Sequence, residues 1–181
     1  MRTTRKWMTR LTATLAISSF VFMAGTGTAG TNPQPRSMED QVRREILSVP
    51  YINVFDNLSY AVDNGVVTLS GQVTRPIDKD YVEQAVKKVA GITRIDNQIE
   101  VLPLSPFDDR IRIATLRALA RTSPLGRYFL GTNPAIRIIV KNGNVALDGV
   151  VLNSGHRQIA YMAANGVSGV FSVTNNLLTE K

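Results

Sequence analysis

The sequence has no cysteine and a single histidine, His156, among its 181 residues. The absence of cysteine excludes disulfide bonds, thiolate metal sites, a cysteine nucleophile and a lipid-modified cysteine anchor. A single histidine excludes metal centres that need several imidazole ligands and leaves one candidate for a histidine-based catalytic relay. Hydrophobic residues still make up 44% of the chain, so the composition predicts a folded protein rather than a disordered one.

The N-terminus has the pattern of a secretory signal peptide. Residues 1–10 carry four basic side chains and no acid, and the uncharged, mostly apolar run Leu11–Met23 follows. This run is shorter than the roughly 20 residues that span a bilayer, and small residues up to Ala29 follow it. We expect cleavage after Ala29, residues 30–37 as a linker, and a periplasmic protein that is not a lipoprotein; an uncleaved signal anchor is the alternative.

The positive charge of the chain is concentrated in two places. The formal net charge is +7, but removal of residues 1–29 lowers it to +3, so the charge is weak support for nucleic-acid binding and we expect none. Residues 39–107 hold 10 acids and 7 bases, a net charge of −3, whereas residues 108–181 hold 4 acids and 9 bases, a net charge of +5. We therefore expect the two halves to meet different surfaces.

The rest of the chain contains an internal repeat. Residues 60–101 align without gaps on residues 138–179, with 11 identities in 42 positions. The repeated positions include Asn64, Gly65, Gly71 and Gly91, which recur as Asn142, Gly143, Gly149 and Gly169. A register kept over several expected elements indicates duplicated structure.

The repeat predicts an α-β-β-α-β order in each half. The two Asn-Gly pairs are typical of hairpin turns with positive φ at both residues, and Gly71 and Gly149 indicate a bulge or a close approach of backbone or helix. Gly91 and Gly169 are expected just past the helix ends. Helices are expected at Met38–Ser48, Asp78–Ala90, Asp108–Arg121 and His156–Ser168, and third strands at Ile92–Leu102 and Val170–Thr179.

This pattern resembles the bacterial BON-domain family, whose members include osmotically inducible periplasmic proteins. The residues that carry the resemblance are the V-x-N-G-x-V-x-L-x-G-x-V core, present twice, and the later glycine before V-x-N. It implies an α+β fold of two tandem BON domains, residues 38–102 and 108–181 with a linker at 103–107, each a three-stranded mixed sheet packed by two helices. It also implies a non-enzymatic module that associates with membranes, with anionic phospholipid binding in some members and chaperone or envelope-maintenance roles in others.

The residues themselves show no catalytic or cofactor site. His156 lacks a second ligand for a metal, the acids of the first hairpin suit turns and helix starts, and no glycine-rich phosphate loop is present. We therefore expect no enzyme activity, metal, cofactor or small-molecule substrate.

The second half has two candidate binding features. Arg110, Arg117 and Arg121 fall within about 40° on a helical wheel, which predicts either a basic stripe for lipid phosphates or an ordinary solvated face. A nine-residue insertion contains Arg127, Tyr128 and Phe129, which either meet a membrane interface or cover the core of their own domain.

The sequence thus predicts an envelope-associated module for the maintenance of the envelope under stress, osmotic stress included. Its expected partner is an anionic phospholipid surface or an envelope protein, bound through the second domain. The alternative is a soluble periplasmic stress chaperone or protein-interaction module. The oligomeric state is not indicated.

Overall fold

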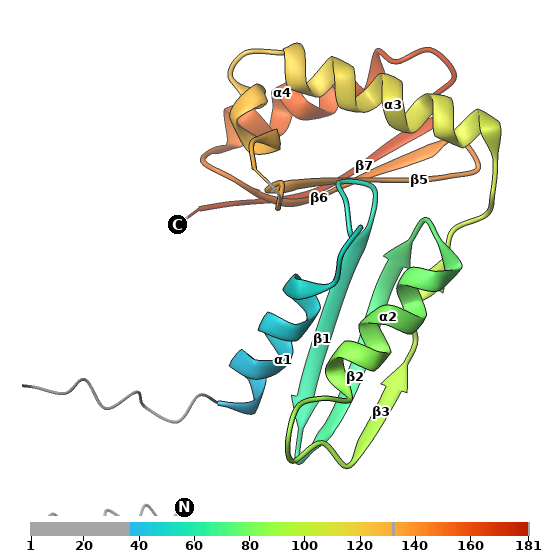
Figure 1. Ribbon diagram of the computed structural model, residues 1–181. Helices are drawn as coiled ribbons and strands as arrows, with labels where there is room; N and C mark the ends of the chain where they lie inside the picture. Colours follow the sequence, from blue (N-terminus) through green and yellow to red (C-terminus); the bar gives the residue numbers. More distant parts are fainter. Residues whose placement is uncertain (1–36, 132, 181) are drawn as a thin grey trace, which may run out of the picture. The chain divides into compact units, whose positions relative to one another are not determined.

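The computed structural model describes residues 37–131 and 133–180 (Figure 1). The expected signal peptide, residues 1–29, and residues 30–36 of the expected linker lie outside them. The elements are α1 (Met38–Ser48), β1 (Asn57–Asp63), β2 (Val66–Val73), α2 (Pro76–Val86), β3 (Arg94–Asn97), β4 (Glu100–Val101), α3 (Pro106–Arg121), the 3₁₀ helix η1 (Leu125–Phe129), β5 (Ile136–Lys141), β6 (Asn144–Val151), α4 (Ser154–Asn165) and β7 (Ser172–Thr179).

Each half is an α-β-β-α-β unit with a mixed sheet, as predicted. β1 and β2 form an antiparallel hairpin, and β3 and β4 both run parallel to β2. In the second half, β5 pairs antiparallel with β6, and β7 pairs parallel with β6. The hairpin's second strand is therefore central in each sheet, and in the second half α3 and α4 cover one sheet face (Figure 1). The α+β class and the two tandem domains of the sequence analysis are confirmed.

The Asn-Gly turns have the backbone conformation that the sequence predicts. The φ angles are 48° at Asn64, 83° at Gly65, 52° at Asn142 and 76° at Gly143. Two consecutive residues with positive φ define the type I′ turn, whose twist matches that of the strands it joins. The turn fixes the hairpin register, which places Val62 opposite Val67.

Gly71 and Gly149 lie in the second strand of each hairpin, opposite the residue near which the first strand begins. A Cβ built on either residue would lie 2.0 Å from a carbonyl oxygen, that of Asn57 or Ala135 respectively. Their φ angles of 111° and 131° are also rare for residues with a side chain. The close-approach interpretation is thus confirmed, and the approaching group is the partner strand's own backbone.

Gly91 and Gly169 do not cap the helices directly, contrary to the sequence-based expectation. Helix α2 ends at Val86 and α4 at Asn165, so a short turn separates each glycine from its helix. Both glycines do have left-handed φ, 87° and 89°, and each turns the chain toward the following parallel strand. The expected strand at Ile92–Leu102 is likewise divided into β3 and β4.

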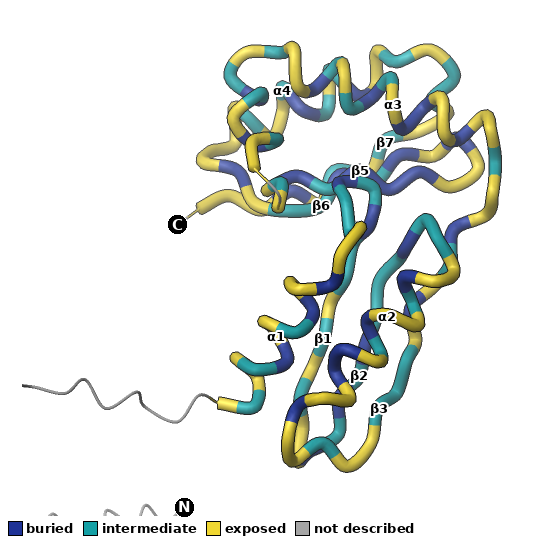
Figure 2. The backbone as a smooth tube through the Cα atoms, in the orientation of Figure 1, coloured by how far each residue is buried: buried dark blue, intermediate teal, exposed yellow. Residues whose placement is uncertain are grey.

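Each half has its own hydrophobic core between its helices and its sheet (Figure 2). In the first half, Val42 of α1 and Val82 of α2 pack with Leu69 of β2. In the second half, Leu119 of α3 and Ala160 of α4 pack with alternate residues of β5 and β6. Within residues 37–131 and 133–180, no helix is long and apolar enough to cross a membrane.

The described residues from Ser37 onward belong to one compact unit, and the loop before β1 links its two halves. Val54 is buried in the core of the second half, and Phe55 packs against the same core. The Ile138 N–H donates a hydrogen bond of 2.8 Å to the Val54 carbonyl, so one residue of the loop pairs with the outer edge of β5. The core of the second half is therefore completed by a residue of the first.

Candidate functional site

Helix α3 presents the charged surface that the sequence analysis singled out. The Ser105 hydroxyl accepts a hydrogen bond from the Asp108 N–H, and Pro106 stands in the first turn, so the start of the helix is well defined. Asp108 is buried and accepts the N–H groups of Asn142 and Gly143 at 2.9 and 2.8 Å. These bonds attach the start of α3 to the β5–β6 turn and fix which helix face is exposed.

This orientation of α3 decides which of its arginines are exposed to solvent. Ile111, Thr115 and Leu119 form the buried face, whereas Arg110, Arg117 and Arg121 are exposed on the opposite side. At 1.5 Å per residue, the three span about 16 Å along the axis. Arg127 in η1 is also exposed, and among the described residues none of the four forms an ion pair.

Other cations of the second half are already used inside the protein. Arg112 is 4% exposed, donates a bond of 2.7 Å to the Val140 carbonyl and pairs with Asp109. Lys141 pairs with Glu100 of β4. The net charge of this half therefore overstates what is free to bind a ligand, and the exposed arginines of α3 and η1 are the relevant part of it.

Exposed apolar side chains adjoin the N-terminal end of α3. Phe107 is 38% and Phe171 is 73% exposed, and their ring centroids are 5.9 Å apart. The Arg110 guanidinium lies over the Phe107 ring, 5.8 Å from its centroid. Leu104, in the connector before the helix, is 86% exposed. Ile113 is 41% exposed and lies one turn after Arg110 on the arginine face of α3.

We call Leu104, Phe107, Ile113 and Phe171 the apolar rim. Sequence reasoning missed it because Phe107 and Phe171 stand at the ends of expected elements and are far apart in the chain. Their only sequence signal was that they are large apolar residues at element ends, outside the strand cores.

Two residues of the expected membrane-binding insertion have a different role. Tyr128 is 8% exposed; its hydroxyl is bonded to the His156 ring and accepts the Leu152 N–H at 3.0 Å. Phe129 is partly buried and packs against the core of its own half. In this structure both rings cover the core of their own half, which is the alternative that the sequence left open; Leu130 next to them is 75% exposed.

His156 has a structural environment. Its backbone N–H donates to the Asn153 side chain, which caps α4, and its Nδ1 lies 2.6 Å from the Tyr128 hydroxyl. Across the described parts of the chain, no group of three His, Cys, Asp or Glu side chains is placed to hold a metal ion.

The two equivalent asparagines close each half in the same way. The Asn97 amide donates to the Lys79 carbonyl and to Glu83, and Asn175 donates to the Arg157 carbonyl at 2.8 Å. Both bind the third strand to the preceding helix. The duplicated residues are thus scaffold, and the features that differ between the halves are the candidates for binding.

Comparison with known proteins shows a match to a family model. A family model described as "BON domain" matches residues 36–103 and 108–181. No curated protein matches the chain at a significant level. Two solved structures of CdsD, a structural protein of the type III secretion system of Chlamydia trachomatis, are similar to it at 12% identity.

The alignment with the first structure, the C-terminal domain of CdsD, covers 78% of this chain and 96% of the CdsD chain, with a TM-score of 0.33. The alignment with the second structure covers 77% of this chain and 90% of the CdsD chain, with a TM-score of 0.31. These scores are too low to support an argument.

Proposed function

The chain belongs to the BON-domain family, a family of membrane- and protein-interaction modules, and on that premise we propose that it binds anionic phospholipid surfaces through its second domain. The observation that carries the proposal is the row of exposed arginines without ion pairs on α3 and η1: Arg110, Arg117, Arg121 and Arg127. The first domain has a net charge of −3.

The arginines supply most of the attraction. An arginine near an anionic membrane surface contributes about 1 kcal/mol, and the contribution falls off within a Debye length. Four such residues provide about 4 kcal/mol, which corresponds to reversible binding in the millimolar range. The guanidinium fork also suits lipid phosphate oxygens better than an ammonium does.

The apolar rim supplies the remaining part of the attraction to the membrane. Exposed Phe107 lies beside Arg110, and exposed Phe171 lies beside Phe107. Aromatic rings beside cations suit the headgroup region of a bilayer. In this proposal they replace Tyr128 and Phe129 as the residues that enter the interface. Helix α3 then lies along the surface with its arginine face toward the lipid.

We further infer a periplasmic location, from the signal-peptide pattern of residues 1–29, and a non-catalytic role in envelope maintenance under stress, osmotic stress included. BON-domain proteins are in general non-catalytic. The alternative, a stress chaperone or protein-interaction module, would use the same apolar rim against an unfolded client or an envelope protein. Such binding would depend on the rim rather than on the arginines, and salt would weaken it little.

Vesicle co-sedimentation of the chain from Gly30 to Lys181 tests the proposal. The chain should bind phosphatidylglycerol-containing vesicles, release most of them at about 0.5 M salt, and ignore phosphatidylcholine vesicles. The double variant Arg117→Glu/Arg121→Glu should lose binding. The matched control is Arg43→Glu/Arg44→Glu, which makes the same charge change on exposed residues of α1 and should keep most of it.

Two results would overturn the lipid assignment. One is equal loss of binding in both double variants, which would show that net charge alone decides. The other is unchanged vesicle affinity in Arg117→Glu/Arg121→Glu, combined with salt-insensitive suppression of client aggregation, which supports the chaperone function. Phe171→Ser should weaken vesicle binding in a salt-insensitive way, because Phe171 is exposed and adds contact area rather than charge.

A further inference from the structure

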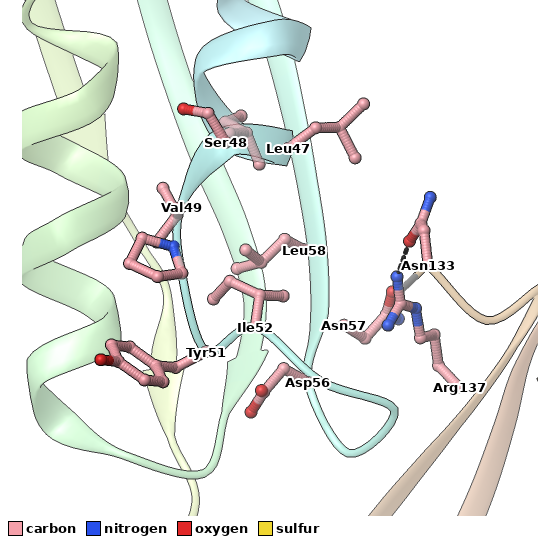
Figure 3. A pocket seen from close by; sticks show the side chains of 12 residues that line it. Leu47, Ser48, Val49, Tyr51, Ile52, Asp56, Asn57, Leu58, Asn133 and Arg137 are labelled. Atoms are coloured by element: carbon pink, nitrogen blue, oxygen red, sulfur yellow. Dashed lines mark hydrogen bonds between the residues drawn. The ribbon is translucent and has the colours of Figure 1, made fainter. Parts of the chain in front are cut away.

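A pocket of about 700 Å³ lies beside the C-terminal end of α1 (Figure 3). Its walls are mainly apolar and come from α1, the following loop and the start of β1: Ile46, Leu47, Tyr51, Ile52 and Leu58. Arg137 and Asn133 of the second half complete it and face these residues (Figure 3). Its volume falls within the range of small-molecule sites, and an apolar lining with few polar groups is typical of such sites.

Arg137 is the cationic group of this pocket. It is half-buried and donates one hydrogen bond of 2.9 Å to the Asn53 carbonyl and another to the Asn133 side chain. Both acceptors are neutral, and among the described residues Arg137 forms no ion pair. Burial lowers the pKa of Arg137, which an anion bound beside it would oppose.

Asp56 also lines the pocket, but its carboxylate already accepts hydrogen bonds from the protein itself. Its carboxylate accepts the N–H groups of Asn53 and Thr74 at 2.9 and 2.7 Å and the Thr74 hydroxyl at 2.9 Å. Asp56 is 1% exposed. It therefore holds the loop in place and, although its charge acts on Arg137, is not a hydrogen-bond partner of that guanidinium.

Tyr51 provides an independent observation. Its φ of 76° is a rare conformation for a residue with a side chain, yet the ring is 66% exposed. The Arg75 guanidinium lies 4.9 Å from the ring centroid and helps to hold it there. A strained backbone that keeps an exposed aromatic ring at a pocket is a feature associated with ligand sites.

We propose that this pocket binds a single-chain anionic amphiphile, with its carboxylate or phosphate on Arg137 and its hydrocarbon chain along Ile46, Leu47, Ile52 and Leu58. The charge and the walls argue for this class together. One arginine matches one anionic head. The apolar side chains of the wall suit a hydrocarbon chain, and the remaining polar lining residues, Ser48 and Asn57 among them, are few. The site is separate from α3 and does not rest on the proposed vesicle binding.

The test is a titration of the chain from Gly30 to Lys181, followed by amide chemical shifts, with three ten-carbon probes below their micelle concentrations. Decanoate and decyl phosphate should bind and shift amides of residues 46–58 and 137, and the two distinguish a fatty acid from a phosphate-headed lipid. Decyl glucoside, which is neutral, should bind at least tenfold more weakly, as expected for a charge-assisted hydrogen bond.

Two variants and their controls separate the pocket from the rest of the surface. Arg137→Met should weaken decanoate binding at least tenfold, while Arg127→Met, on an exposed arginine elsewhere in the same half, should not. Because Arg137 also holds the Asn53 carbonyl, Leu47→Ser is the second variant; Leu47 is 55% exposed and outside both cores. It should lower affinity severalfold, whereas Leu130→Ser should not.

Three results would overturn the proposal. The first is no binding of either anionic probe. The second is decanoate affinity in both Arg137→Met and Leu47→Ser that equals that of the unmodified chain. The third is chemical-shift changes that map to α3 instead of residues 46–58. Preference for a short peptide with a C-terminal leucine carboxylate over decanoate would also replace the amphiphile by a protein chain end. Arg117→Glu/Arg121→Glu should leave decanoate affinity unchanged, so failure of the vesicle proposal and failure of this one are distinguishable.

Discussion

The Tyr128 hydroxyl lies 2.6 Å from Nδ1 of His156 and also accepts the N–H of Leu152 at 3.0 Å. These bonds join η1, the end of β6 and the first turn of α4. The insertion that distinguishes the second half from the first is thereby part of its core rather than a projecting loop. In the proposed function, this half therefore binds lipid through the exposed arginines of α3 and η1 and through the apolar rim, without Tyr128 and Phe129.

Tyr128→Phe should therefore lower the free energy of unfolding by about 1–3 kcal/mol, because the His156 ring and the Leu152 N–H both lose their partner in a poorly hydrated place. Chemical denaturation of the Gly30–Lys181 chain measures this. Vesicle binding should not change. A variant with normal stability but weaker vesicle binding would show that the hydroxyl contacts lipid after all.

Gly149→Ala should destabilise the second half by about 3 kcal/mol or more. The added methyl would meet the Ala135 carbonyl oxygen at 2.0 Å, and the residue would also have to adopt a φ of 131°. Gly131→Ala is the matched control, since its φ is 83° but no atom lies within 4 Å of the new Cβ.

Gly131→Ala should lower the free energy of unfolding by only about 1–2 kcal/mol, the contribution of the backbone conformation alone. Equal melting temperatures for the two variants would contradict the close approach at Gly149.

Val54→Ala should destabilise the second half although Val54 belongs to the first. The side chain is 9% exposed and packs in the second core, so its truncation should cost about 1–3 kcal/mol. Hydrogen exchange is the sharper measurement, because the Ile138 N–H bonded to the Val54 carbonyl should exchange faster. Val150→Ala, on a side chain that is 43% exposed, should leave that amide unchanged; a similar effect of both variants would argue against the contact.

Glu83 should make a small, pH-dependent contribution to stability. A hydrogen bond from Lys87, and then one from Asn97, lower the pKa of Glu83. A carboxyl with a lower pKa in the folded state stabilises the protein above its unfolded pKa and loses that contribution as the pH falls through the folded pKa.

Because the Lys87–Glu83 pair is largely exposed, its contribution is a few tenths of a kcal/mol. The unfolding free energies of the chain and of Glu83→Gln should therefore differ slightly at pH 7 and converge as the pH falls through the folded-state pKa of Glu83. A difference that persists or grows in acid would contradict this sign.

The sequence by itself determined the repeated architecture. The Asn-Gly pairs fix the turn type, because αL backbone at two consecutive residues is a local property. Alternation along Val67, Leu69 and Val73 fixes which strand face is buried, and all three are. The helix ends were less certain, since Gly91 and Gly169 have the positive φ expected of a cap but stand several residues beyond the last helical turn.

Only the tertiary structure decided what each candidate binding residue does. The helical period placed Arg110, Arg117 and Arg121 on one face, but whether Tyr128 lies inside or outside depends on the position of His156, a contact between residues distant in sequence. The same holds for the Phe107–Phe171 pair and for Val54. A local pattern sets backbone conformation and facing, whereas burial depends on what the rest of the chain brings to the same place.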